Sequence, residues 1–235
     1  MTSSNRDSPI KRARILTAAA TLFAEKGVEG TTLAMIAKAS GAAVGSITHY
    51  FGDKPRLAAA VHDNLVDRLI AVAEAALGGY GTDPSAAIRT LLSDCLAWVE
   101  AFPHDPSLIA VLAAYTSKQA QDRMDGMQQR LARVLATWAE PLVHANTVAP
   151  LTSTQLYAVI LAPAMCAAMP FAGAASNNRE SSVGWLPVLA AAAVRAIAPP
   201  NRKPNQPFPG GSDVRAQPPL STSPPRPTGQ GDLLR

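Results

Sequence analysis

A short run of residues, "VGSITH" at 44–49, combines hydrogen-bonding side chains with very little bulk. Ser46 and Thr48 carry hydroxyl groups that donate and accept, and His49 carries an imidazole. Val44 adds a small apolar group, and Gly45 leaves the backbone bare. Such groups can contact the base edges and phosphates of a nucleic acid, which is the chemistry that this run could perform.

Catalytic chemistry has less support. The sequence has no GxSxG, HExxH or phosphate-loop motif, and "GGYG" at 78–81 lacks the spacing of a nucleotide-binding loop. The four histidines are dispersed, with no cluster of carboxylates beside them. Cys95 and Cys166 lie in apolar helical patterns without a CxxC or Cys/His cluster. We therefore expect no enzyme activity, no metal site, no cofactor and no disulfide, and the reduced cysteines indicate a cytoplasmic protein.

Two short helices around a glycine must position the run at 44–49. Thr32 is a good N-cap for a helix that Gly41 ends, and a second helix from about Ala43 buries Ile47 and Phe51. With those two side chains inward, the outward face presents Val44, Gly45, Ser46, Thr48 and His49. Residues 31–50 thus have the spacing of a helix-turn-helix motif, whose second helix enters the major groove of DNA.

The charge distribution agrees with a polyanion-binding N-terminus. Residues 1–57 contain eight Lys and Arg against four Asp and Glu, whereas residues 58–198 contain eight against eleven. A basic end on a mildly acidic body is typical of a nucleic-acid-binding module attached to another function. Arg6, Lys11, Arg12 and Arg14 form a basic arm that could reach adjacent phosphates or make no contact at all.

The segment from Ala18 to Leu57 resembles the N-terminal domain of the tetracycline-repressor (TetR) family of transcriptional regulators. The resemblance rests on ten positions: Phe23, Gly27, Thr32, Ile36, Ala37, Gly41, His49, Tyr50, Phe51 and Lys54. It implies that Thr32, Tyr50 and Lys54 touch the DNA backbone. With the outward face of the second short helix, the expected DNA-contacting residues are Thr32, Val44, Gly45, Ser46, Thr48, His49, Tyr50 and Lys54.

This chain departs from the family pattern at two positions. Ala43 stands where the family usually has a serine that caps the helix, and Thr48 stands where a tyrosine is usual. The contact that this tyrosine makes in relatives cannot be carried over intact.

The whole chain reads as all-α, with a nine-helix, two-domain TetR-like architecture. We expect a disordered arm at 1–9, a DNA-binding domain at 10–56, a helical ligand-binding and dimerisation domain at 57–198, and a disordered Pro-rich tail at 199–235. The expected helices cover Pro9–Lys26, Thr32–Ser40, Ala43–Phe51, Asp53–Leu77, Asp83–Phe102, Asp105–Tyr115, Ser117–His144, Leu151–Phe171 and Val183–Ala198.

The remaining expectations concern the helical domain at 57–198. Helices near 152–171 and 183–198 are the best candidates for a homodimer face, as the family resemblance implies. The uncharged stretch Leu156–Ala175 is long enough to span a bilayer, but its two prolines and its alanine content favour a buried interface over a membrane span. Aromatic residues and methionines could line an apolar pocket or simply form the core: Trp98, Phe102, Tyr115, Met124, Met127 and Trp138.

The sequence thus predicts a dimeric, ligand-responsive regulator, a repressor that binds a palindromic operator through the major groove and is released by a small apolar effector. The alternative, suggested by Ala43 and Thr48, is a helical binding module of the same fold without DNA affinity. Neither the operator, the effector, the regulated genes nor the choice between repression and activation can be read from the residues.

Overall fold

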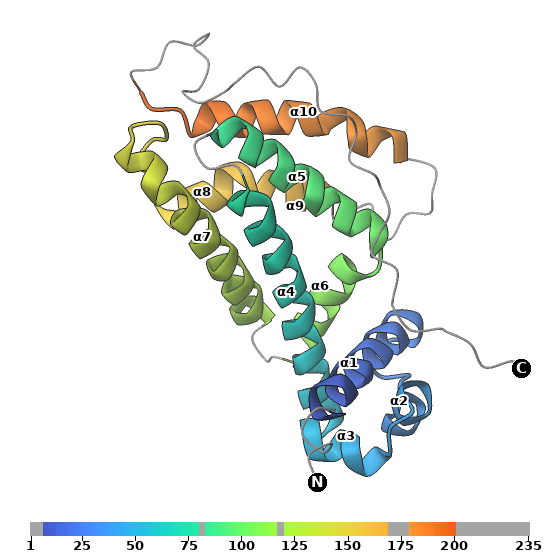
Figure 1. Ribbon diagram of the computed structural model, residues 1–235. Helices are drawn as coiled ribbons and strands as arrows, with labels where there is room; N and C mark the ends of the chain where they lie inside the picture. The colour runs from blue at the N-terminus through green and yellow to red at the C-terminus, as the bar shows by residue number, and fades with distance from the viewer. Residues whose placement is uncertain (1–6, 80–82, 117–119, 169–178, 201–235) are drawn as a thin grey trace, which may run out of the picture.

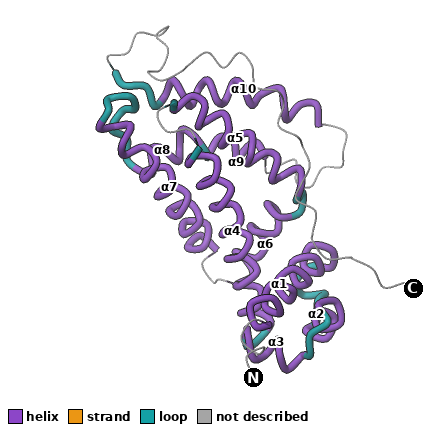
Figure 2. Tube along the Cα trace, viewed as in Figure 1, coloured by secondary structure: helices purple, strands orange, loops and turns teal. Residues whose placement is uncertain are grey.

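The computed structural model describes residues 7–79, 83–116, 120–168 and 179–200. Over these residues the chain is entirely helical, without strands, as predicted (Figures 1 and 2). The helices in chain order are α1 (Asp7–Lys26), α2 (Leu33–Ser40), α3 (Val44–Phe51), α4 (Lys54–Gly78), α5 (Pro84–Ala101), α6 (Asp105–Thr116), α7 (Ala120–His144), α8 (Ser153–Ile160), α9 (Ala162–Ala168) and α10 (Arg179–Ala196).

Helices α1 to α3 form a small unit at one end of the molecule, below helices α5 to α10 in Figure 1. Ile15 and Phe23 of α1, Ile36 of α2 and Ile47 and Phe51 of α3 are all at least 93% buried. Each such side chain contributes about 1.5–3 kcal/mol by leaving water. The two α3 residues that the sequence placed inward are the only buried residues of that helix.

Local capping sets where these helices begin and end. The Thr32 side chain accepts a hydrogen bond from the backbone N–H of Met35 at 3.2 Å, and Gly41 ends α2 in the left-handed region at φ 65°. The Asp53 carboxylate likewise caps α4. As predicted, Ala43 gives α3 no side-chain cap, so this helix lacks an interaction worth about 1 kcal/mol.

Helix α4 connects the small unit to the body. Its first turns pack against α1 and α3, and the helix also packs against α5, α6 and α7 (Figure 1). Three ion pairs fix it to the body: Asp63–Arg123 and Asp67–Arg130 join it to α7, and Arg68–Asp105 joins it to α6. Helix α6 in turn packs against α1. The body therefore reaches the small unit through two elements.

The single helix predicted at Leu151–Phe171 is wrong. The chain forms α8 and α9 instead, separated at Leu161, so the described residues contain ten helices rather than nine. Pro163 explains the break, because proline has no N–H to donate to the carbonyl of residue 159, and its ring clashes with that carbonyl. Residues 169–171 of the prediction lie outside the described residues.

Two other boundaries differ from the predictions. Helix α1 begins at Asp7, inside the arm expected at 1–9 to be disordered, and α10 begins at Arg179, before the Val183 at which the last helix was expected to begin. The first six residues of the expected arm, residues 80–82 after α4 and residues 201–235 of the Pro-rich tail lie outside the described residues. Across the described residues, no helix has both the length and the hydropathy needed to cross a membrane.

Candidate nucleic-acid interface

The solvent face of α3 consists of small groups held on a short, firmly anchored helix. Val44 is 43% exposed despite being apolar, and Thr48 and His49 are also exposed. Gly45 faces open space, since a Cβ atom added there would meet nothing within 4 Å. Ser46 is half-buried. Another surface could therefore approach the backbone of this helix closely.

Hydrogen bonding defines what this face can offer. The Thr48 hydroxyl donates to the backbone carbonyl of Val44 at 3.2 Å, which leaves its oxygen lone pairs free to accept. His49 packs its ring edge-on against Tyr50, with the centroids 5.5 Å apart. Tyr50 is half-buried and also contacts the ring of Phe51. The face thus presents hydroxyl oxygen and imidazole nitrogen atoms beside a supported aromatic ring.

Thr32 lies at the N-terminus of α2, where it is exposed. Its hydroxyl oxygen accepts from Met35 as the helix cap, so its O–H remains able to donate. Unpaired backbone N–H groups at a helix N-terminus attract anions. The position suits the phosphate contact that the sequence predicted for Thr32.

Lys54 has a role that the sequence did not indicate. Its ammonium group donates to the backbone carbonyls of Val28 at 3.0 Å and Thr31 at 3.3 Å, and it lies 3.5 Å from the Glu29 carboxylate. The first residue of α4 is thereby tied to the loop between α1 and α2. A phosphate contact by Lys54, which was predicted, would have to displace the exposed Glu29.

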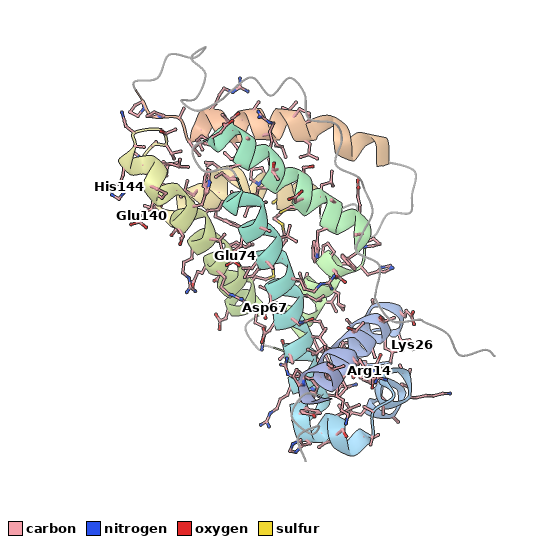
Figure 3. The ribbon with its side chains drawn as sticks, viewed as in Figure 1. Arg14, Lys26, Asp67, Glu74, Glu140 and His144 are labelled. Carbon is pink, nitrogen blue, oxygen red and sulfur yellow. The ribbon has the colours of Figure 1, made fainter. Side chains whose placement is uncertain are left out.

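Arg14 also differs from its expected place in a basic arm. Its Nη2 donates to the backbone carbonyl of Ser40 at 2.7 Å, and it stands where a Cβ atom on Gly41 would come within 2.7 Å (Figure 3). The guanidinium therefore holds the end of α2 and the turn that leads to α3. Arg12 lies over the Phe51 ring, 5.4 Å from its centroid, while Arg6 lies outside the described residues. No sequence motif predicts the contact of Arg14 with Ser40 or that of Arg12 with Phe51.

The six residues predicted to line a pocket do not share one cavity. Trp98 borders an interior cavity of about 30 Å³, whereas Trp138 borders a surface groove of about 470 Å³ between α4 and α7. Phe102 is 43% exposed and packs under the Arg68 guanidinium, whose carbon lies 4.1 Å from the ring centroid. The other three belong to the core or pack against it: Tyr115, Met124 and Met127.

The interior cavity has a mostly different lining. Sequence reasoning missed these residues because those before residue 107 read as ordinary core positions, and those from Leu161 onward lie in the segments assigned to the dimer face. They are Leu69, Leu92, Cys95, Leu96, Val99, Pro106, Leu161, Ala164, Met165 and Leu186.

Metal chemistry has no visible site in the described part of the chain. No group of three or more His, Cys, Asp or Glu side chains there could hold an ion. Cys95 is buried and Cys166 is exposed, and both are free thiols. Burial, followed by the charge of Asp94, raises the pKa of the Cys95 thiol to about 12, so this thiol stays neutral at physiological pH.

Comparisons with known proteins agree with this geometry. Residues 15–61 match the profile of the family described as bacterial regulatory proteins, tetR family. The HTH-type transcriptional regulator BetI of Burkholderia ambifaria is 27% identical over 125 residues, covering 53% of this chain and 61% of the relative's length. The chain thus matches only about three fifths of that relative.

Solved structures extend the likeness to most of the fold. A TetR family transcription regulator from Marinobacter aquaeolei aligns with a TM-score of 0.58 at 19% identity, covering 83% of this chain and 97% of that one. NalD, the secondary repressor of the MexAB-OprM multidrug efflux pump in Pseudomonas aeruginosa, aligns with a TM-score of 0.54 at 20% identity, covering 81% and 98%. At these identities the likeness shows the fold.

Proposed function

We propose that the chain is a regulator of the TetR family and acts as a dimeric, ligand-responsive transcriptional repressor; the match of residues 15–61 to the tetR family profile and the shared fold support this. The observation that carries the proposal is the solvent face of α3. A helix that exposes a glycine, a valine, a threonine and a histidine side by side gains nothing for the core from them. The same groups suit the major groove, where base edges present donors, acceptors and the thymine methyl group.

We assign roles on DNA by the chemistry of each group. Val44 meets a thymine methyl group, and Ser46, Thr48 and His49 hydrogen-bond base edges or phosphates. Gly45 allows the α3 backbone to approach the DNA. The backbone contacts fall to three residues beside α3, namely Thr32, Tyr50 and Lys54.

Dimerisation is proposed through α8, α9 and α10, which cover the helices expected near 152–171 and 183–198. Helix α10 leaves apolar surface exposed: Val188 is 63% exposed, and Pro187, Ala191 and Ala192 are also exposed. An isologous dimer would bury this surface and present two α3 helices related by a two-fold axis. Two such helices read half-sites about one DNA turn apart or more, so the operator is expected to be palindromic.

Regulation would pass through the two elements that join the body to the small unit. A ligand that displaces α6 or α4 would move α1 and α3, because α6 packs against α1, and α4 packs against both. The separation of the two α3 helices would then no longer fit successive major grooves. Binding of an effector in the helical body, or its release, would thereby change the affinity of the protein for DNA.

A genome-wide selection of DNA fragments by the purified full-length protein tests this function. We expect enrichment of a palindrome, whereas enrichment of no sequence would refute the regulator and leave the alternative of a helical binding module without DNA affinity. His49→Ala supplies the finer test: it should cost roughly 1–3 kcal/mol at one base position of that palindrome. Equal weakening on all sequences would reassign His49 to the phosphate backbone.

A further inference from the structure

The interior cavity is bounded by α4, α5 and α6 on one side and by Leu161, α9 and α10 on the other. None of its lining side chains carries a charge. The Cys95 thiol remains neutral, as its raised pKa requires. A charged molecule would find no opposite charge here. The free energy needed to bury an unpaired charge in an apolar site is much larger than the free energy that apolar contacts contribute.

Trp98 supplies one unused hydrogen-bond donor. Its side chain is 6% exposed, and its indole Nε1–H has no acceptor among the described residues. A buried donor without an acceptor destabilises the protein, because it has lost its hydrogen bond to water and gained none in return. An acceptor atom brought into the cavity could recover much of that cost, whereas a hydrocarbon could not.

The walls can yield to an occupant. A volume of about 30 Å³ holds roughly one water molecule, so a larger molecule must displace side chains. Met165 is suited to this, because methionine is unbranched and adapts its shape. Pro106 lies in the first turn of α6, which packs against α1 and α4. Displacement of Pro106 would therefore move α6 and, through its contacts with α1 and α4, the small unit formed by α1 to α3.

We propose that this cavity takes a compact, uncharged, mainly apolar molecule with a single hydrogen-bond acceptor, such as a ketone, which accepts from Trp98 Nε1. The assignment of this molecule as the effector rests on the proposed function, but its binding does not. The α4–α7 groove differs in kind, since Glu74, Arg130 and Arg133 line it and would favour a charged ligand.

Isothermal titration of the full-length protein with three probes of similar size tests the proposal. Acetophenone carries an acceptor, ethylbenzene has none, and benzoate is charged. We expect acetophenone to bind about tenfold more tightly than ethylbenzene, the equivalent of one hydrogen bond of about 1.4 kcal/mol. Benzoate should not bind in the cavity.

Two matched variants locate the site. Trp98→Phe keeps an aromatic ring but removes the donor, so it should weaken acetophenone about tenfold and leave ethylbenzene unchanged. Trp138→Phe is the control, because the Trp138 Nε1 is also buried without an acceptor among the described residues but lines the groove. It should change neither affinity. Ala164→Leu should fill the cavity and abolish binding of both probes.

The contrary results are distinct. No binding of acetophenone, equal binding to the wild-type protein and Trp98→Phe, or loss of binding only in Trp138→Phe would each overturn the proposal. Acetophenone binding that Arg133→Gln abolishes and Trp98→Phe leaves unchanged would move the site to the groove. If acetophenone binds as expected but the protein selects no DNA, the cavity assignment stands and the regulator proposal falls.

Discussion

At the scale of single residues, Lys54 joins two parts of the small unit. Its ammonium group bonds two backbone carbonyls of the α1–α2 loop, and its third N–H is available to Glu29. The Lys54 side chain is 23% exposed and that of Glu29 is 84% exposed. The two carbonyl bonds are therefore the strong part of the arrangement, and the ion pair is a weak surface one that a phosphate can replace.

Lys54→Met tests both roles of this residue. Loss of the charge-assisted hydrogen bonds should lower the free energy of unfolding by about 1.5–3 kcal/mol, measured by urea denaturation. If a phosphate also binds there, the dependence of DNA affinity on salt should flatten by about one unit of slope. Glu29→Gln is the control, and it should change stability by about 0–1 kcal/mol. Stability unaffected by Lys54→Met would contradict the structural role.

Asp94 gives a pH dependence at the same scale. Burial raises the pKa of this half-buried α5 carboxyl above its usual 3.8. A carboxyl whose folded pKa exceeds its unfolded pKa stabilises the fold at pH values below the unfolded one, and this contribution is lost as the pH rises through the folded pKa.

Asp94→Asn should therefore raise the free energy of unfolding at neutral pH, and the gain should vanish below about pH 4. Urea denaturation of both proteins between acidic and neutral pH provides the measurement. A gain that does not change with pH would mean that packing, not ionisation, accounts for the difference.

At the scale of elements, two features of α3 lower the stability of the helix while they leave its outer face accessible. It has no side-chain cap at Ala43 and contains an exposed glycine at position 45. Both features weaken a helix that is only 8 residues long, and only Ile47 and Phe51 anchor it in the core. A helix built for packing alone would be expected to have neither weakness.

Two substitutions in or beside α3 should separate stability from DNA binding. Gly45→Ala should stabilise the protein by up to about 1 kcal/mol, because the added methyl group meets open space, yet weaken DNA binding if the backbone approaches the bases. Ala43→Ser should add about 1 kcal/mol through the missing cap and leave the reading face unchanged. Thermal melts and fluorescence anisotropy on the selected operator measure the two effects, and unchanged DNA affinity of Gly45→Ala would place α3 farther from the groove.

Gly41 contrasts with Gly45, because two separate features exclude a side chain at position 41. Its φ of 65° disfavours any residue with a Cβ atom, and the Arg14 guanidinium occupies the space where that atom would lie. The turn between α2 and α3 is therefore fixed by backbone conformation and by a side chain from α1 together.

At the scale of the whole molecule, the small unit and the body meet through α4 and α6. The ion pairs of Asp63 and Asp67 hold α4 to α7, and Arg68 lies between the Asp105 carboxylate and the Phe102 ring. Figure 3 shows Asp67 and Glu74 along α4. Because α4 packs against α3 as well as against the body, a movement of α4 in the proposed regulation would displace α3.

The chain after Pro200 should be dispensable for the fold. The final described hydrogen bonds close before it: Ala149 donates to the carbonyl of Ile197 at 2.8 Å, and Ala198 donates to that of Arg195. The residues that follow are rich in proline and poor in apolar side chains. Removing residues 201–235 should leave the melting temperature of the full-length protein unchanged. Light scattering should still give the molar mass of a dimer of the shortened chain. A monomeric product would show that the tail takes part in assembly.

The sequence by itself determined the elements of the small unit, because their signals are local. Thr32, Gly41 and Asp53 act within a few residues of their own positions, and the period of Ile47 and Phe51 decides which face of α3 points outward. The missing cap at Ala43 was expected from the resemblance to the TetR family, in which a serine usually stands at this position, and the structure confirms it. The break between α8 and α9 also had a local cause in Pro163, but alanine-rich periodicity around it favoured one continuous helix.

Only the tertiary structure decided what depends on side chains reaching between elements. Lys54 meets a carbonyl 26 residues away in the chain, and Arg14 meets another at the same separation, so neither contact leaves a pattern in the sequence. The pocket follows the same rule: Trp98 and Trp138 read alike as apolar helix positions, yet they border different spaces. Periodicity tells which face of a helix is buried, but the packing of several helices decides where a cavity remains and which donor is left unpaired beside it.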